Sequence, residues 1–318
     1  MTRLSIRPFS DEYIAHAGEL LAARHRAHRA AEPLLPRRYE EPAAATELVA
    51  ELAGRDGASG AVALRAGRVV GYLLGVRESD DRFGQAVWID HAGHAVDEAE
   101  DLRDLYAAAA YEWVEDEFTR HHVRVPATDP SVLNSWYRLS FGQQHAYAIQ
   151  EIPETSWPDG ARPAREADID ALVELAPLLS EHQARSPVFV PRPSPSDRDE
   201  LRRDLLEDFA NDEIANLVFD RDGRVVAWFH VTPVERSGAH AGVARPESAA
   251  LLSWAATEPA GRRAGAGLAL TQAAFAWARE RGYEVMVIDW RVTNLLASRF
   301  WPARGFRETF LRLYRHIP

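Results

Sequence analysis

The sequence contains no cysteine among its 318 residues. That absence excludes a disulfide framework, a thiol nucleophile and any thiolate metal site, and we expect a cytoplasmic protein. Long apolar runs are also lacking, since no segment approaches the ~20 residues that a membrane helix needs. The longest candidate, residues 105–114, is interrupted by Tyr111, Glu112 and Trp113. No apolar stretch of the signal-peptide type follows the first residues. We therefore expect no membrane partner.

Positive charge is in short supply, because 37 Lys and Arg face 48 Asp and Glu, for a net charge of −11. Nucleic-acid binding requires a basic face, so no nucleic-acid partner is expected. An acidic field favours a cationic or amine substrate, although acidity also aids solubility.

The neighbouring histidines His91, His94, His121 and His122 invite a metal interpretation. No motif supplies four ligands, however, and no metal site is predicted.

The chain is long enough for two domains, and one pattern occurs twice in it. Each copy has an extended start before an acidic helix, then a hairpin strand after a tight turn, then an aromatic pair near a glycine. The matching segments are 4–9 and 160–164, 66–76 and 222–231, and 136–142 and 300–306. We predict a domain over residues 1–153, a Pro- and Gly-containing linker over 154–160, and a second domain over 161–318.

Hydrophobic periodicity predicts a mixed α/β class in both copies. Predicted strands are 61–64, 69–77, 86–90, 123–126 and 146–152, then 215–219, 225–231, 250–257, 285–289 and 310–314. Predicted helices are 11–31, 43–53, 97–118 and a short one from 131, then 169–184, 196–209, 266–281 and 295–303. Four prolines in residues 186–195 predict an extended loop, either a plain connection or a substrate lid.

A glycine-rich turn lies between the predicted strand 250–257 and the predicted helix 266–281. Such a turn gathers unpaired amides at a helix N-terminus, where the helix dipole favours a phosphate group. Gly265 and Gly267 permit close approach to the backbone, and Arg262 and Arg263 can neutralise phosphate charge. The Walker pattern and the dinucleotide pattern G-x-G-x-x-G are both absent, since residues and spacing differ.

The remaining pattern, Arg262-x-x-Gly265-x-Gly267, resembles the pyrophosphate loop of the GCN5-related N-acetyltransferase (GNAT) superfamily. Thr257-Glu-Pro259 stands where that family has Val-x-Pro, and 288–306 matches the family's fifth strand and following helix. The resemblance implies two tandem domains, each a mostly antiparallel mixed sheet flanked by helices. It also implies acetyl-CoA as cofactor, and transfer of the acetyl group to a small-molecule amine that attacks the thioester directly.

The resemblance further implies which residues contact acetyl-CoA. The backbone of residues 255–257 would pair with the pantetheine amides, and the amides of 263–268 would hold the pyrophosphate. Asn294 would contact the cofactor arm, with two aromatic side chains near the thioester sulfur. The full set is Ala255, Ala256, Thr257, Arg262, Arg263, Ala264, Gly265, Ala266, Gly267, Leu268, Asn294, Phe300 and Trp301.

The first copy lacks this constellation. Its corresponding segment, Asp90–Asp97, has one glycine and no arginine, with an acidic residue at each end that would repel an anion. We expect this copy to have lost cofactor binding and to serve as a packing partner, with a contribution to the acceptor pocket left open.

The attacking amine must lose a proton, and Glu235 and His230 are the preferred candidates for the base, ahead of Glu258 and Asp289. Many family members place a tyrosine four residues before a Gly-Phe pair, as the acid for the leaving thiolate. This sequence has Trp301 there, which has no useful proton, and Tyr137 corresponds to it in the first copy. Ser253, Tyr314 or solvent remain as acids.

A non-catalytic acyl-CoA-binding or sensing protein is the alternative function, because the expected tyrosine is missing and the first copy is degenerate. The acceptor, the acyl-chain preference and the oligomeric state cannot be read from the residues, and a homodimer stays open. Function depends on the site rather than the fold.

Overall fold

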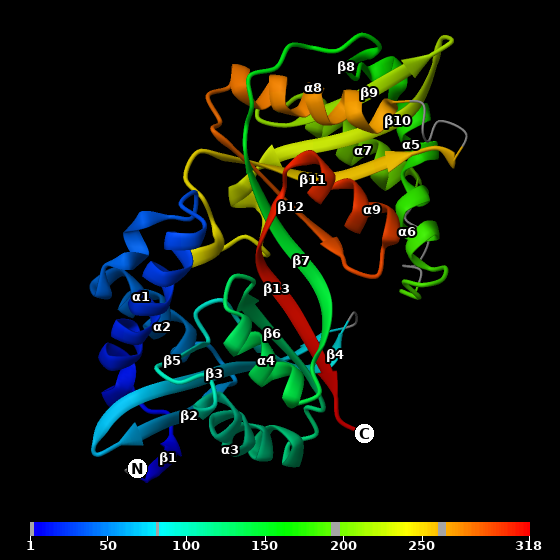
Figure 1. The fold of residues 1–318 in the computed structure, drawn as a ribbon. Helices are drawn as coiled ribbons and strands as arrows, with labels where there is room; N and C mark the ends of the chain where they lie inside the picture. Colours follow the sequence, from blue (N-terminus) through cyan, green and yellow to red (C-terminus); the bar gives the residue numbers. More distant parts are fainter. Residues whose placement is uncertain (1–2, 81–82, 192–197, 260–264) are drawn as a thin grey trace. The chain divides into compact units, whose positions relative to one another are not determined.

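The structure, a computed structural model, describes residues 3–80, 83–191, 198–259 and 265–318 (Figure 1). It contains two compact units. The first takes the chain up to Tyr147 together with residues 241–246 and 308–318. The second takes residues 148–240 and 247–307. The compact units therefore do not follow chain order, and the predicted domain boundaries remain predictions about the two sequence copies.

The first unit is built on a sheet with the order β1-β2-β3-β4-β6-β13-β7, and β5 lies beside β3. The pairs β1–β2, β2–β3, β3–β4, β3–β5 and β6–β13 are antiparallel, whereas β4 and β6 run parallel. Its strands are β1 (Leu4–Pro8), β2 (Ala58–Arg65), β3 (Arg68–Asp80), β4 (Gly84–Ile89), β5 (His94–Val96), β6 (Arg120–Pro126), β13 (Arg307–His316) and the first part of β7 (Gly142–Glu151). Its helices are α1 (Ile14–Ala31), α2 (Pro42–Ala53), α3 (Asp101–Glu115) and α4 (Pro130–Arg138).

The second unit has the strand order β7-β12-β11-β10-β9-β8, with the last residues of β7 at one edge. Its strands are β8 (Ala161–Pro163), β9 (Ala215–Arg221), β10 (Arg224–Pro233), β11 (Ala249–Thr257) and β12 (Val285–Arg291). Its helices are α5 (Ile169–Leu175), α6 (Pro177–Gln183), α7 (Arg198–Phe209), α8 (Ala266–Glu280) and α9 (Leu295–Phe300), with a short 3-10 turn η4 (Val234–Arg236) after β10. The predicted mixed α/β class is confirmed.

Neighbouring residues of β10 point to opposite faces of the second sheet, as strand geometry requires. Trp228 packs in a cluster with residues of α5 and α7, whereas Phe229 contacts Trp301 beyond α9. Figure 1 shows α8 on one face and α5 and α7 on the other. The two faces are therefore lined by different helices, which decides where each candidate side chain lies.

The repeated hairpin of the sequence is repeated in the backbone. Ala66 and Gly67 have φ angles of 53° and 79°, and Asp222 and Gly223 have 53° and 78°. Two successive positive φ values are typical of the tight hairpin turn that matches strand twist. The turns join β2 to β3 and β9 to β10, so the hairpin predicted twice occurs twice.

A second feature shared by the two copies corrects one residue match that was drawn from the sequence. The amide of Phe141 donates to the carbonyl of Trp136 at 3.2 Å, and the amide of Phe306 donates to that of Trp301 at 3.4 Å. The two rings of each pair also lie in edge contact. Trp136, not Tyr137, is thus the counterpart of Trp301. The sequence comparison was shifted by one residue, because the first copy has Phe-Gly where the second has Gly-Phe.

Three predicted elements differ from the structure. The helix expected over 169–184 is two helices, α5 and α6, because Pro177 opens a new helix after Ala176. The helix expected from residue 97 begins at Asp101, since residues 94–96 form the unpredicted strand β5. The last strand of the chain, β13, pairs with β6 of the first unit.

In the described residues no helix combines the length and apolar character needed to cross a membrane.

Candidate functional site

The parallel strands β11 and β12 lie side by side for only part of their length. Ala249–Leu251 pair with Val285–Val287, and past Leu251 these two fully described strands show no further pairing with each other. Figure 1 shows the two arrows spreading apart. Residues 255–257 of β11 stay paired with β10 on their other side. The parting of β11 and β12 therefore leaves one edge of β11 without a neighbouring strand, where extended ligand amides could pair.

The helix α8 follows β11 in the sequence, and Gly265 directly precedes its first residue. Gly265 is the N-cap and has a φ of +86°, a left-handed conformation that glycine adopts without strain. A Cβ atom added to Gly265 would meet none of the described residues within 4 Å. The first amides of α8 and its dipole therefore form a setting that favours an anion. The predicted contacts Arg262, Arg263 and Ala264 lie outside the described residues.

The remaining predicted residues of this turn divide by exposure. Ala266 is buried, and Leu268 is exposed. Gly267 lies close to Phe300, since a Cβ atom at Gly267 would be 3.3 Å from the ring carbons Cε2 and Cζ. The structure thus brings Gly265, Gly267 and Phe300 together at the start of α8.

Phe300 and Trp301 have different surroundings although they are neighbours. Their rings meet edge to face at 4.8 Å, and Trp301 is buried. The Trp301 ring packs against Phe229 and Phe306, with centroids at 6.0 and 5.6 Å. Trp301 is therefore part of the core of the second unit, while Phe300 is partly exposed beside the first turn of α8.

Asn294 caps a helix. Its Oδ1 accepts from the amides of Leu296 and Ala297 at 3.2 and 3.3 Å, which holds the start of α9. The same oxygen lies 3.1 Å from Nε2 of His182 on α6. Asn294 is also buried. The geometry accounts for Asn294 as a structural residue, and the cofactor contact stays a prediction.

His230 lies within a three-residue hydrogen-bonded chain on the face covered by α7. Its Nδ1 lies 2.6 Å from Oγ of Ser253 on β11, and its Nε2 lies 3.0 Å from Oδ2 of Asp208 on α7. The sequence predicted His230, and named Ser253 as one candidate acid. Asp208 was missed, because its position on α7 carries no local motif.

Glu235 is in a different place. It follows β10 in η4, beyond the pair formed by Pro233 and Ala250. Residues 255–257 lie at the opposite end of β11. Glu235 lies near Tyr283, whose pKa is raised by burial and by Glu213 and Glu235. The structure does not bring Glu235 together with His230 or with the residues at the start of α8.

Residues 178–306 match the model of the acetyltransferase (GNAT) family. This segment contains β11, the start of α8, α9 and His230. Residues 178–306 form a GNAT domain. A search of curated proteins gave no match to the chain.

Solved structures support the fold over the whole chain. A GCN5-related N-acetyltransferase from Sphaerobacter thermophilus superposes with a TM-score of 0.59 at 15% identity, covering 98% of this chain and 95% of its own. A GCN5-related glucosamine N-acetyltransferase region of a fungal multi-domain β-N-acetylglucosaminidase gives 0.55 at 14% identity, covering 99% of this chain and 38% of its own. At these identities the likeness establishes the GNAT fold.

The first unit differs from the GNAT domain at the matching position. The segment after β4 turns back and forms β5, whose residues pair with β3. The acidic residues expected to repel an anion are both paired, Asp90 with Arg124 and Asp97 with Arg68. Neither carboxylate is therefore free to repel an anion as expected, and the loss of cofactor binding by this copy stays a prediction. Part of the segment, His94–Val96, forms β5.

Six histidines of the first unit are buried in its core. Burial lowers the pKa to about 4 for His25, His91 and His121, and to about 3 for His28, His94 and His122. Their rings pack on aromatic neighbours; His122, for example, stacks on Trp88 at 4.1 Å. No group of three or more metal-ligating side chains is arranged to hold an ion within the described part of the chain.

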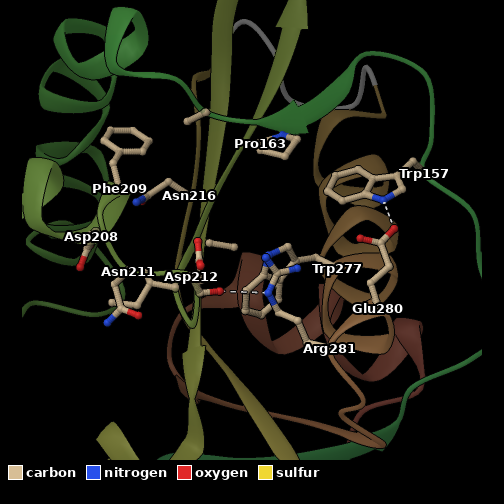
Figure 2. A pocket seen from close by; sticks show the side chains of 13 residues that line it. Trp157, Pro163, Asp208, Phe209, Asn211, Asp212, Asn216, Trp277, Glu280 and Arg281 are labelled. Carbon is tan, nitrogen blue, oxygen red and sulfur yellow. Dashed lines mark hydrogen bonds between the residues drawn. The ribbon is translucent and has the colours of Figure 1, made fainter.

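A pocket of about 280 Å³ lies in the second unit, away from the start of α8 (Figure 2). Trp157 and Glu280 are joined at one side by a 2.6 Å hydrogen bond, and Arg281 donates to the carbonyl of Asp212 at 3.0 Å. Asp208 lines the opposite side, with its carboxylate remote from the tryptophans. Among the predicted cofactor residues that the structure describes, none lines this pocket.

Proposed function

We propose that this protein transfers an acetyl group from acetyl-CoA to the amino group of a small-molecule acceptor, by direct attack of the amine on the thioester. The observation that carries the proposal is the parting of β11 and β12 beside the glycine-opened start of α8, within a GNAT domain. The net charge of −11 agrees with a cationic acceptor, since an acidic field raises its local concentration.

The described residues fit the proposed donor. The backbone of residues 255–257 would hold the pantetheine arm as a strand would, and the first amides of α8 would hold the pyrophosphate. Gly265 and Gly267 carry no Cβ where the backbone must be approached. When bound, acetyl-CoA supplies the activated acyl group, and the protein's task is to orient the amine and manage its proton.

Thermal unfolding with and without acetyl-CoA tests donor binding. A ligand at 100 times its Kd raises the free energy of unfolding by about 2.7 kcal/mol. The melting temperature of a domain this size then rises by about 5–10 °C. The shift should vanish in Gly265→Trp. Gly282→Trp is the matched control, because Gly282 has a φ of +79° and equally open surroundings at the other end of α8. If the thermal shift is lost in both variants, the loss in Gly265→Trp comes from backbone strain and not from a blocked binding site.

Thiol release from acetyl-CoA over a panel of small amines then tests catalysis. Steady release that depends on one amine supports the transferase. Tight binding of acetyl-CoA without release across the panel would favour the alternative, an acyl-CoA-binding or sensing protein. Absence of any thermal shift at millimolar acetyl-CoA would contradict both.

A further inference from the structure

The hydrogen bonds around His230 settle which ring nitrogen carries the proton when the ring is neutral. Asp208 is acceptor-only when ionised, so the 3.0 Å contact requires a proton on Nε2. Nδ1 then has a free lone pair and accepts from the hydroxyl of Ser253 at 2.6 Å, a shorter contact than the 3.3 Å from the same hydroxyl to the carbonyl oxygen of His230. This order of carboxylate, imidazole and hydroxyl, each within hydrogen-bond reach of the next, is the arrangement that activates a hydroxyl group.

Ser253 occupies a special position on β11. His230 pairs with Trp254 and Val231 pairs with Leu252, so Ser253 is the extra residue of a β-bulge. It comes just after Leu251, where the pairing with β12 ends, and just before residues 255–257. Its side chain is exposed. The bulge thus presents an accessible hydroxyl against His230 of β10, two residues past the last pair of β11 with β12.

We propose that Ser253, His230 and Asp208 form a proton relay for acetyl transfer, with Ser253 as the group that touches the reacting atoms. Asp208 and His230 act through it as positioning residues. The inference rests on the proposed function and supplies the proton donor that Trp301 cannot provide. Neither Asp208 nor a relay follows from the sequence motif.

The amine attacks in its neutral form, after an ammonium acceptor has released its extra proton to solvent, and the relay handles the remaining protons of the reaction. As the amine nitrogen bonds to the acetyl carbon, Ser253 Oγ accepts the nitrogen's proton and passes its own to Nδ1 of His230. Asp208 stabilises the imidazolium that results. When the carbon–sulfur bond breaks, His230 returns a proton through Ser253 to the departing thiolate. The products are the N-acetyl amine and the free thiol, and all three side chains regain their starting states.

Nitrogen NMR of the ¹⁵N-histidine-labelled protein without ligand provides the first test. The neutral ring of His230, assigned with His230→Gln, should carry its proton on Nε2 with Nδ1 unprotonated. In Asp208→Asn this preference should weaken, because the charged acceptor is gone. A neutral ring protonated on Nδ1 in the wild type would overturn the relay, whatever the enzyme's activity.

Kinetics with an amine found in the panel provides the second test. Ser253→Ala should lower kcat by ~100-fold, the lower range for general acid–base catalysis, with the KM for acetyl-CoA changed less than about twofold. Ser253→Thr should retain most of the activity because it keeps the hydroxyl, and Asp208→Asn should lose at least about tenfold. Ser180→Ala is the matched control, since that hydroxyl donates to Pro177 within α6.

The outcomes separate the relay from the function on which it rests. Turnover by Ser253→Ala at the wild-type rate, with an active wild type, would overturn the relay and leave the transferase intact. An acetyl adduct on Ser253 in intact-mass spectra would replace the relay with a covalent route. Donor binding without turnover by the wild type would overturn the transferase, even where NMR finds the expected tautomer.

Discussion

Phe300 lies against Gly267, where a Cβ atom would come within 3.3 Å of two of its ring carbons. This distance is shorter than most real contacts of a Cβ atom, so the ring would have to move by a few tenths of an ångström. The first turn of α8 and the end of α9 thus depend on each other's shape at the proposed pyrophosphate site.

We expect Gly267→Ala to weaken acetyl-CoA binding by roughly tenfold, about 1.4 kcal/mol, because the added methyl group displaces Phe300 or the turn. Global stability should change little, since alanine is the better helix former. Isothermal titration with acetyl-CoA measures the effect. Gly238→Ala is the control, as no residue in the described part of the chain lies within 4 Å of a Cβ atom placed there. Equal affinities in both variants would show that the contact is irrelevant to binding.

Asn294→Ala should destabilise the second unit by about 1 kcal/mol, because the amides of Leu296 and Ala297 lose their cap. Asn294→Asp keeps an acceptor oxygen and should recover most of that loss. Urea unfolding followed by tryptophan fluorescence measures both. The same proteins test the predicted cofactor contact: a matching loss of acetyl-CoA affinity in Asn294→Asp, with stability retained, would support it.

The buried histidines of the first unit predict acid sensitivity. Each has a folded-state pKa of about 3 to 4, below the ordinary value near 6.5, so the unfolded chain binds protons first as pH falls. The contribution of these neutral histidines to the free energy of unfolding is fully present above about pH 6.5. It is lost as the pH falls from there to about 4, at about 1.4 kcal/mol per pKa unit for each histidine. Urea unfolding at pH 7.5, 6 and 5 measures the slope.

His122→Phe is the variant that isolates one of these histidines. It keeps a ring beside Trp88 but removes a group whose two ring nitrogens have no hydrogen-bond partner among the described residues. The pH dependence of the unfolding free energy should become shallower by the contribution of one histidine. An unchanged slope would mean that His122 already titrates normally in the folded protein.

Phe310→Ala should destabilise the first unit by ~3–5 kcal/mol, as expected for a buried phenylalanine. Phe310 is fully buried, and the rings of His28 and His91 contact it at 4.7 and 4.6 Å. Phe189→Ala is the control, because that ring is exposed. Hydrogen exchange of the β6 amides, which pair with β13, should speed up in Phe310→Ala alone. Equal exchange in the two variants would contradict this role for β13.

Local sequence signals predicted most strands and helices to within a few residues, because periodicity and turn chemistry act locally. The helix start directly after Gly265 and the two hairpin turns were correct for this reason. Pro177 was overlooked as a helix start. The strand β5 was hidden by a histidine that reads as polar, although His94 and its neighbour Ala95 are buried.

Relationships across the chain were harder to predict. His230 was chosen for its chemistry, but its partner Asp208 lies on a helix with no motif, and the bulge at Ser253 depends on the register of β10 with β11. Glu235 was chosen for its place after a strand, and the structure puts it at the far end of β11 from residues 255–257. The partner of β13 could not be read either, since an apolar strand does not specify which sheet edge it joins.

The placement of β13 has a consequence for biosynthesis. Seven residues of this strand, Phe310–His316, pair with β6, which the ribosome makes almost two hundred residues earlier. Chains generally fold domain by domain from the N-terminus as they emerge. Here the first unit cannot close its sheet at that stage, and the edge of β6 must wait for β13. Completion of the first unit's sheet is thereby tied to the synthesis of a strand that follows the whole second unit in the chain.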